Sequence, residues 1–111
     1  MTKKIKVIIK EPDEPVGHIE EIRNELTAFQ DIVGGLIEVV QIADGSDRIL
    51  MICNEDGKYL PDLDPNIHVS VKGWQDLIFG TVIICGDWRQ DFAECPIDLK
   101  TWEMLLRKWG N

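Results

Sequence analysis

The chain has 111 residues, 44% of them hydrophobic and 29% charged, which is the composition of one globular domain with a modest core and argues against disorder. Its formal net charge of -8 disfavours direct binding to DNA or RNA, because affinity for nucleic acid comes mainly from cations that displace counterions from the phosphates. The acidic surface suits a basic protein partner, or only keeps the protein in solution, and the apolar runs are far too short to span a membrane.

The first segments are predicted to form two strands joined by a turn. Residues 3–9 alternate between apolar and mainly basic side chains, which is typical of a strand with one buried face. The two prolines within residues 11–15 exclude regular structure there. Residues 16–22 alternate more weakly and are expected to pair back onto the first strand.

A short amphipathic helix is predicted over residues 24–33. Asn24 is a favourable N-cap, and Glu25 places a negative charge in the first turn. Apolar side chains follow at helical spacing. Gly34-Gly35 then ends the helix, because glycine readily takes the left-handed conformation of a cap.

Residues 36–42 and 48–54 are predicted to form an antiparallel hairpin. Both runs are rich in β-branched residues, and a loop with Gly and Asp at 44–47 connects them. The Asp-Gly step within residues 55–58 indicates a second, tight hairpin turn. Tyr59-Leu60 can add a short strand after that turn.

A long loop and a buried strand are expected next. Residues 61–73 are predicted to be an irregular surface loop with one turn of helix at most, and such loops are often functional. Residues 77–85 form a strongly apolar run that predicts a central strand. Gly80 within it indicates a bulge or a close approach of the backbone. Residues 86–95 are polar again.

The last helix is predicted to start at its N-cap Asp98 and run through Trp109, with Gly110 as its stop. Its apolar face should pack across the sheet and comprises Leu99, Trp102, Leu105, Leu106 and Trp109. Hairpins without repeated β-α-β spacing indicate one α+β domain over residues 1–111. We expect a mainly antiparallel sheet with two helices, one internal and one carboxyl-terminal, packed on it.

The reactive side chains do not form the pattern of an enzyme. Cys53 and Cys85 lie in apolar strand runs, where a thiol behaves as a small hydrophobe. Cys53 or Cys95 could meet His68 in three dimensions, but sequence spacing does not support a catalytic pair. His18 and His68 are expected to face solvent or to be locally hydrogen-bonded. No signal peptide is recognisable, so we expect reduced thiols and a cytoplasmic protein.

No metal or cofactor site is expected. The histidines and cysteines lack the paired spacing of a zinc site. Acidic residues in the loops at 44–47 and 55–56 lack the periodicity of a calcium-binding loop. Gly34-Gly35 follows a helix, whereas a phosphate-binding loop needs its glycines before one.

Tryptophans and arginines are the candidates for ligand binding. Trp102 and Trp109 are predicted to be core residues of the last helix, whereas Trp74 and Trp88 are predicted to lie in loops on either side of the apolar strand. Loop tryptophans can anchor a protein interface or stack on a base, and packing of the loops is the alternative interpretation. The candidate ligand-binding residues are therefore Trp74, Trp88, Arg89 and Arg48.

Acidic loop residues are the candidates for a protein interface. Complementary charge would raise the encounter rate with a basic partner and orient it. We expect the acidic loops to cluster at one end of the sheet. The candidate interface residues are Asp44, Asp47, Glu55, Asp56, Asp62 and Asp64.

Four stretches together resemble a family of small proteins of unknown function from phages, plasmids and integrative elements. They are K-V-I-I-K-E-P at 6–12, V-G-G-L-I-E-V-V at 33–40, I-C-N-E-D-G-K at 52–58 and G-T-V-I-I-C-G at 80–86. The resemblance implies a mobile-element setting and no assigned catalytic residue. The Trp-rich carboxyl end departs from the family pattern, which puts a shared partner in doubt.

Three functions follow from these observations. The first hypothesis is a non-enzymatic protein that counteracts host defence by binding a defence or nucleic-acid-binding protein of the host through its acidic surface. Alternatively, it is an oligomeric sponge for a cyclic nucleotide or a cyclic ADP-ribose-type signal. The third hypothesis is a structural module that forms homo-oligomers through an exposed sheet edge. An enzyme acting on nucleotides is the least supported class.

Overall fold

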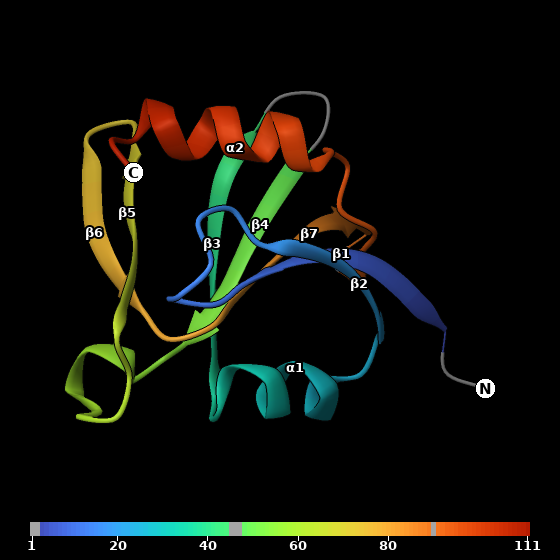
Figure 1. The fold of residues 1–111 in the computed structure, drawn as a ribbon. Coiled ribbons are helices and arrows are strands. Elements are labelled where there is room, and N and C mark those ends of the chain that lie inside the picture. Colours follow the sequence, from blue (N-terminus) through green and yellow to red (C-terminus); the bar gives the residue numbers. More distant parts are fainter. Residues whose placement is uncertain (1–2, 45–47, 90) are drawn as a thin grey trace.

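The computed structural model describes residues 3–44, 48–89 and 91–111. It confirms the predicted α+β class: a mainly antiparallel sheet carries an internal and a carboxyl-terminal helix (Figure 1). The main sheet has the strand order β2–β1–β7–β4–β3, and the short β8 pairs with β7. Its strands are β1 Lys4–Lys10, β2 His18–Arg23, β3 Ile37–Asp44, β4 Arg48–Asn54, β7 Val82–Trp88 and β8 Asp91–Ala93.

The two predicted hairpins of the main sheet are confirmed. β1 and β2 pair antiparallel from Lys4 opposite Arg23 to Ile9 opposite His18. β3 and β4 pair antiparallel from Ile37 opposite Asn54 to Asp44 opposite Arg48, with an irregularity between Gln41 and Ala43. The two hairpins do not touch edge to edge, because β7 lies between β1 and β4.

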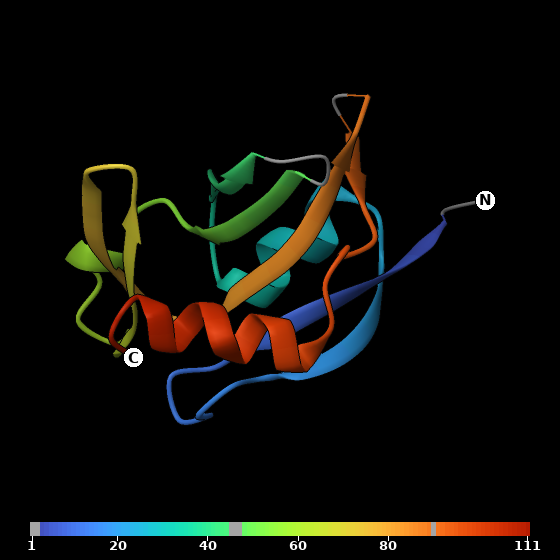
Figure 2. The same ribbon diagram turned by 90° about the horizontal axis from the view of Figure 1, so that it is seen from above.

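Each face of the main sheet has its own cover. α2 (Leu99–Lys108) and a two-stranded hairpin pack on one face, where Trp102 lies in the same apolar cluster as Met51 and Ile84. α1 (Leu26–Val33) packs on the other face, where Phe29 meets Ile52. Figure 1 shows the sheet between α2 above and α1 below, and Figure 2 shows α2 lying across the sheet.

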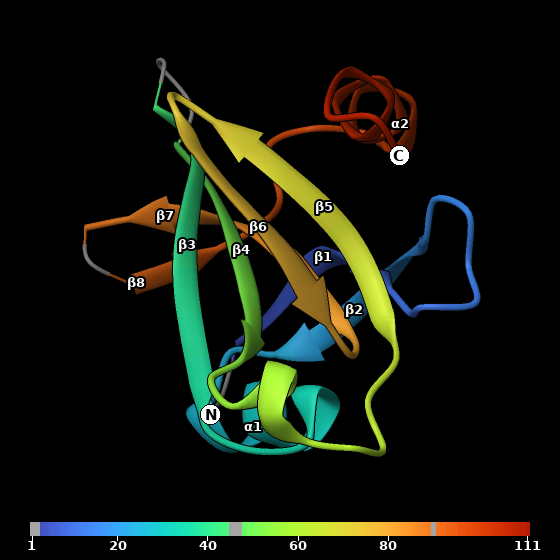
Figure 3. The ribbon, with the colours of Figure 1, turned by 90° about the vertical axis from the view of Figure 1, so that its left-hand side faces the viewer.

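The predicted loop at 61–73 and the single strand at 77–85 are wrong. Residues 65–79 form a hairpin instead, made of β5 (Pro65–Val71) and β6 (Trp74–Phe79) (Figure 3). Gly80, with φ +81°, ends β6, and the chain then enters the main sheet as β7. The apolar run concealed this break because apolar residues stand on both sides of Gly80, although only β7 is largely buried and Leu77 of β6 is 42% exposed. Polar residues at alternate positions of β5 concealed the other strand.

The predicted turn at 55–58 and the short strand at Tyr59-Leu60 are also wrong. A 3-10 helix occupies Gly57–Tyr59, and Asn54 Oδ1 accepts a hydrogen bond from the Asp56 N–H at 2.8 Å. Gly57 is needed for space, since a Cβ there would lie 3.0 Å from the carbonyl oxygen of Phe79. The glycine thus marks the close approach of β6 and not a hairpin turn.

One of the two predicted N-caps is wrong. Glu25, not Asn24, is the N-cap of α1. The Asn24 N–H bonds the Lys3 carbonyl at 2.8 Å, which extends the β1–β2 ladder, and its side chain turns elsewhere. The other predictions are confirmed: Gly34 is left-handed with φ +81°, and Asp98 accepts a hydrogen bond from the Thr101 N–H at 2.8 Å.

Candidate functional site

The main sheet forks at its β1–β7 junction. β1 pairs with β7 only through Ile8, Ile9 and Lys10. Further along β7, Ala93 of β8 lies opposite Gly86 and takes the place that Lys6 would have in a continuous β1–β7 ladder. Lys6 instead bonds the segment after β8, accepting from the Cys95 N–H at 2.8 Å and donating its own N–H to Glu94 Oε2 at 3.1 Å.

Two further contacts hold β8 in the fork. The segment after β8 passes directly over Gly86 of β7. A side chain at that position would collide with the carbonyl of Glu94, so only glycine fits there. Asn24 Nδ2 donates to the Phe92 carbonyl at 2.8 Å. The Phe92 ring packs on Phe29 of α1, with ring centroids 4.6 Å apart. The short strand is therefore fixed by side chains from β2's end and α1.

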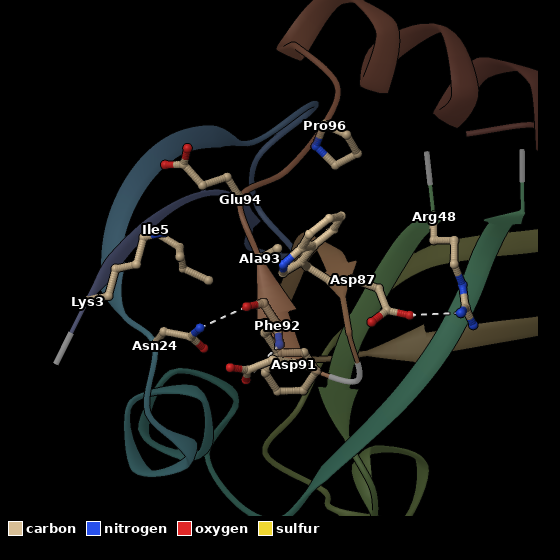
Figure 4. A pocket seen from close by; sticks show the side chains of 12 residues that line it. Lys3, Ile5, Asn24, Arg48, Asp87, Asp91, Phe92, Ala93, Glu94 and Pro96 are labelled. Carbon is tan, nitrogen blue, oxygen red and sulfur yellow. Dashed lines mark hydrogen bonds and ion pairs between the residues drawn. The ribbon is translucent and has the colours of Figure 1, made fainter. Parts of the chain in front are cut away.

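A cavity of about 630 Å³ opens at this fork, and we call it the fork hollow (Figure 4). Trp88, which is 64% exposed, is one of its lining residues, and so is Phe92. Its charged lining contains three carboxylates and two cations, so the hollow is more acidic than basic. The lining residues are Lys3, Ile5, Asn24, Arg48, Gly86, Asp87, Trp88, Asp91, Phe92, Ala93, Glu94 and Pro96.

Arg48, a predicted ligand residue, lies in the fork hollow but is already paired. Its guanidinium is 3.2 Å from Asp87 Oδ2 (Figure 4) and donates to Gln41 Oε1 at 3.0 Å. The Asp87 side chain is the less exposed partner, at 15% against 55% for Arg48. The pair therefore places a fixed carboxylate in the wall and leaves Arg48 poorly available to an anionic ligand.

Trp88 and Arg89 lie together at the tip of the β7–β8 hairpin. The Arg89 guanidinium carbon is 5.1 Å from the centre of the Trp88 ring, within the range of a cation–π contact. Arg89 has φ +51°, a left-handed conformation that is uncommon outside glycine. The cation thus covers one part of the indole instead of pointing into the hollow as a separate binding group.

Trp74 does not join this site. It is the first residue of β6, lies opposite Val71 at the tip of the β5–β6 hairpin and is 40% exposed. The prediction that both tryptophans occupy loops is wrong, since Trp74 begins β6 and Trp88 ends β7. Of the four predicted ligand residues, the fork hollow brings together Trp88 and Arg48, with Arg89 beside the former.

The predicted acidic interface is divided. Asp44 ends β3 opposite Arg48, whereas Glu55 and Asp56 follow Asn54 at the other end of β4. Seven residues of extended strand separate those ends by roughly 20 Å, so the expected single cluster is wrong. Asp62 and Asp64 precede β5. Asp47 lies outside the described residues.

The sequence did not identify the carboxylates of the fork as candidate site residues. Asp87, Asp91 and Glu94 approach one another because β8 turns back on β7 and the chain then crosses over Gly86. A three-residue strand gives little periodic signal. One feature of the sequence could have predicted this hairpin. It is the polar run that follows Gly86, which begins at Asp87 and ends at Asp91.

Smaller hollows also lie beside β3, and two of them are lined by Glu38 and Val39. The first, here the Val39 hollow, measures about 340 Å³ and adjoins the fork hollow, with which it shares four lining residues. Its walls are Val39, Gln41, Arg48, Leu50, Asp87, Asp91 and Phe92. The second, the Glu38 hollow, measures about 160 Å³ and lies between β3, the 3-10 helix and β6. Its polar walls include Glu38, Glu55, Lys58, Tyr59 and Asp76.

The thiols are poorly suited to catalysis. Burial raises the pKa of Cys53 and of Cys85 to about 12, so neither is a thiolate near neutral pH. Cys53 Sγ donates to the Glu38 carbonyl, and Cys95 Sγ donates to the Ile97 carbonyl. The His68 ring bonds the Trp109 carbonyl at 2.9 Å, and not a thiol. His18 bonds Glu14 at 2.8 Å, as expected of a locally bonded histidine.

Two features are absent from the described part of the chain. Its His, Cys, Asp and Glu side chains include no group of three that could hold a metal ion. None of its helices is long and apolar enough to cross a membrane.

Comparison with known proteins gives one match. The family model described as "Domain of unknown function (DUF3846)" matches residues 5–107. Neither the curated proteins nor the solved structures contain a match to the chain.

Proposed function

The chain belongs to the DUF3846 family, and we propose that it is a non-enzymatic binding protein that docks a basic surface of a partner protein at the fork hollow. The observation that carries the proposal is an indole that is 64% exposed over a carboxylate-rich cavity. Tryptophans of this kind are enriched among the residues that dominate interface energies.

Charge favours a basic partner. The chain carries a formal net charge of -8, and carboxylates outnumber cations in the walls of the fork hollow. A long-range field of this sign speeds encounter with a basic protein, and a fixed carboxylate such as Asp87 then orients the partner's cation. The apolar stem of an arginine or lysine would lie against Trp88.

The proposal that the protein is not an enzyme rests on the thiols and histidines. Cys53 and Cys85 are buried with raised pKa values, and His68 is occupied by a backbone carbonyl. Nucleophilic catalysis needs a nucleophile within hydrogen-bond reach of a base. Holding a partner requires none of these groups.

The resemblance to phage, plasmid and integrative-element proteins supplies the setting of the proposal. A small accessory protein that acts by binding fits the inhibition of a host defence effector or of another host protein that binds nucleic acid. Such an effector has a basic groove, and an acidic protein can occupy that groove in place of the nucleic acid.

The test compares two tryptophans. Immobilised wild-type protein, Trp88→Ala and Trp74→Ala are exposed to lysates of bacteria that carry candidate defence systems, and retained proteins are identified by mass spectrometry. We expect a basic protein that the wild type and Trp74→Ala retain, that Trp88→Ala loses, and whose retention weakens steeply with salt. Retention that is insensitive to both Trp88 and salt contradicts the proposal.

A second candidate function is the sequestration of a nucleotide signal. The volume of the fork hollow, about 630 Å³, is that of a small-molecule site, and Trp88 could stack on a base. This function ranks lower because Asp87 already neutralises Arg48. Thermal shifts with cyclic nucleotides and cyclic ADP-ribose isomers test it, since a ligand of the folded state raises the melting temperature. Unchanged melting with all of them removes this candidate.

A further inference from the structure

The outer edge of β3 carries hydrogen-bonding groups that its neighbour does not use. The Glu55 N–H bonds the Leu36 carbonyl at 2.9 Å, which fixes the alternation of the β3–β4 ladder. In an antiparallel ladder, every second residue directs its N–H and C=O away from the partner strand. For β3 these residues are Ile37, Val39 and Gln41, and β3 pairs with no second strand in the described chain.

This edge is less protected than the edge of β8. The outward N–H of Phe92 bonds the Asp91 carboxylate at 3.0 Å, and its carbonyl bonds Asn24 at 2.8 Å. β3 contains no proline and no lysine, the residues that commonly block an exposed edge. Its one irregularity lies near its end, between Gln41 and Ala43.

Hollows flank this edge on both faces of the sheet. Glu38 and Val39 are successive residues, so their side chains point to opposite faces. Glu38 lines the hollow next to β6, and Val39 lines the hollow next to Phe92. A strand added alongside β3 would direct alternate side chains toward these two hollows, which is the way edge-binding domains select peptides.

The walls of both hollows favour cations. The Glu38 hollow contains three carboxylates and one cation, with Lys58 paired to Asp76. The Val39 hollow contains two carboxylates and one cation, together with apolar surface from Val39, Leu50 and Phe92. A second copy of this chain would bring another formal charge of -8, so charge complementarity selects a basic occupant.

We propose that the outer edge of β3 pairs with an extended basic segment of the partner, which adds a strand to the main sheet. Every second side chain of that segment is an arginine or lysine that enters the more acidic Glu38 hollow, and the apolar side chains between them lie against Val39, Leu50 and Phe92 in the Val39 hollow. This inference rests on the proposed function and names the mode of binding. The fork hollow, which adjoins the Val39 hollow, would hold the continuation of the same segment over Trp88.

The first experiment compares two protein variants, each with one proline on a different edge strand of the main sheet. Val39→Pro removes an outward N–H without breaking the β3–β4 ladder, which edge positions tolerate. Ile19→Pro is the matched control, because Ile19 lies on the opposite edge strand β2, has the same 46% exposure and also directs its N–H outward.

The ligand is a peptide of alternating arginine and valine, about eight residues long to match the 8 residues of β3. We expect Val39→Pro to weaken peptide binding at least about tenfold and Ile19→Pro less than about twofold, measured by fluorescence anisotropy.

A second experiment modifies the peptide and uses wild-type protein, so the test does not depend on whether Val39→Pro folds. Two versions of the peptide carry backbone N-methyl groups at alternate residues, one version at odd positions and one at even positions. Only one set of N–H groups can face β3, so one version should bind wild-type protein and the other should not. Equal binding by both versions, or by a peptide with its arginines and valines in separate blocks, overturns the strand-addition proposal.

Two further outcomes are distinguishable. A wild-type dimer in light scattering that Val39→Pro converts to a monomer would assign the edge to a second copy and overturn this proposal. A basic lysate protein lost by Trp88→Ala but retained by Val39→Pro would also overturn it, while the proposed function at the fork hollow would stand.

Discussion

The two hairpins that follow one another in the carboxyl-terminal half each present an exposed tryptophan, but they differ in how their strands are anchored. β5–β6 carries Trp74 at its tip, and β7–β8 carries Trp88. Each turn contains a non-glycine residue with positive φ, Lys72 at +44° and Arg89 at +51°. The two hairpins share this feature, and the difference lies in what their strands contact.

The β5–β6 hairpin is part of the core, whereas the β7–β8 hairpin ends at an open fork. Ile67 and Val69 of β5 are fully buried in the cluster that contains Trp102. β8 has only three residues, and its Phe92 reaches α1 while the space between Trp88 and Ile5 remains open. Exposure of a tryptophan is thus a poor guide to a site unless a cavity lies beneath it.

The largest expected effect comes from removing a core contact of the β5–β6 hairpin. Ile67→Ala should lower the free energy of unfolding by about 2–5 kcal/mol, because it leaves a cavity in a fully packed site. Chemical denaturation measures the change, and Trp88→Ala serves as the comparison with an expected loss below about 0.5 kcal/mol. Similar losses for the two variants would show that the hairpins are anchored alike.

A smaller loss is expected at the polar tie between β5 and β1. Asn66 donates to the carbonyls of Lys10 and Gly80 at 2.9 and 2.8 Å, and its side-chain oxygen accepts from the buried Lys10 ammonium. Asn66→Ala should lower the free energy of unfolding by about 1–3 kcal/mol, because three partners lose their hydrogen bonds. Gln75→Ala, an exposed change on β6, is the control and should be neutral within about 0.5 kcal/mol.

The sequence was informative where a pattern was local and misleading where tertiary contacts decided the outcome. The β1–β2 and β3–β4 hairpins and the cap at Asp98 follow from periodicity and capping rules, and all were predicted. β5 was missed because its Asn66 and His68 are polar, although Asn66 bonds Lys10 and His68 bonds Trp109. Those partners lie 56 and 41 residues away along the chain, beyond any local window.

The site was only partly predictable for the same reason. Trp88 was identified from its residue type, but Asp87 and Glu94 gain significance only because the chain crosses Gly86. Arg48 was selected as a phosphate ligand, and its pairing with Asp87 depends on the β4–β7 register, in which Ile49 lies opposite Gly86. Sequence alone does not give that register.

The ion pair at the fork should matter little for stability, in contrast to the polar tie at Asn66. Arg48→Ala should lower the free energy of unfolding by less than about 1 kcal/mol, because the arginine is more than half exposed and water screens the pair. Its effect on binding should have the opposite sign: removing Arg48 frees Asp87 for a partner cation, so the basic peptide should bind more tightly. Titration of that peptide checks this, with Asp87→Asn expected to weaken binding, and weaker binding by Arg48→Ala would contradict the role given to Asp87.

The smallest effect on stability is expected at His18. This residue belongs to neither the β5–β6 nor the β7–β8 hairpin, so its variant is a reference for the variants in both. The hydrogen bond that the His18 ring donates to the Glu14 carboxylate raises the pKa of His18 above its usual value of 6.5. A raised pKa in the folded state means that the folded protein binds the proton more tightly, so the pair stabilises the fold at pH values below 6.5. That contribution disappears as pH rises through the folded pKa. Because His18 is 41% exposed, the contribution of the pair to stability should amount to a few tenths of a kcal/mol.

Denaturation of wild type and His18→Gln at pH 5.5 and pH 8.5 should therefore show a small difference in stability at the lower pH and a smaller one at the higher pH. Peptide binding compared between the two proteins at the same pH should be equal. A difference in stability that grows with pH would reverse the sign of the linkage, and a loss of binding would show that the partner reaches beyond the fork and the β3 edge to β2.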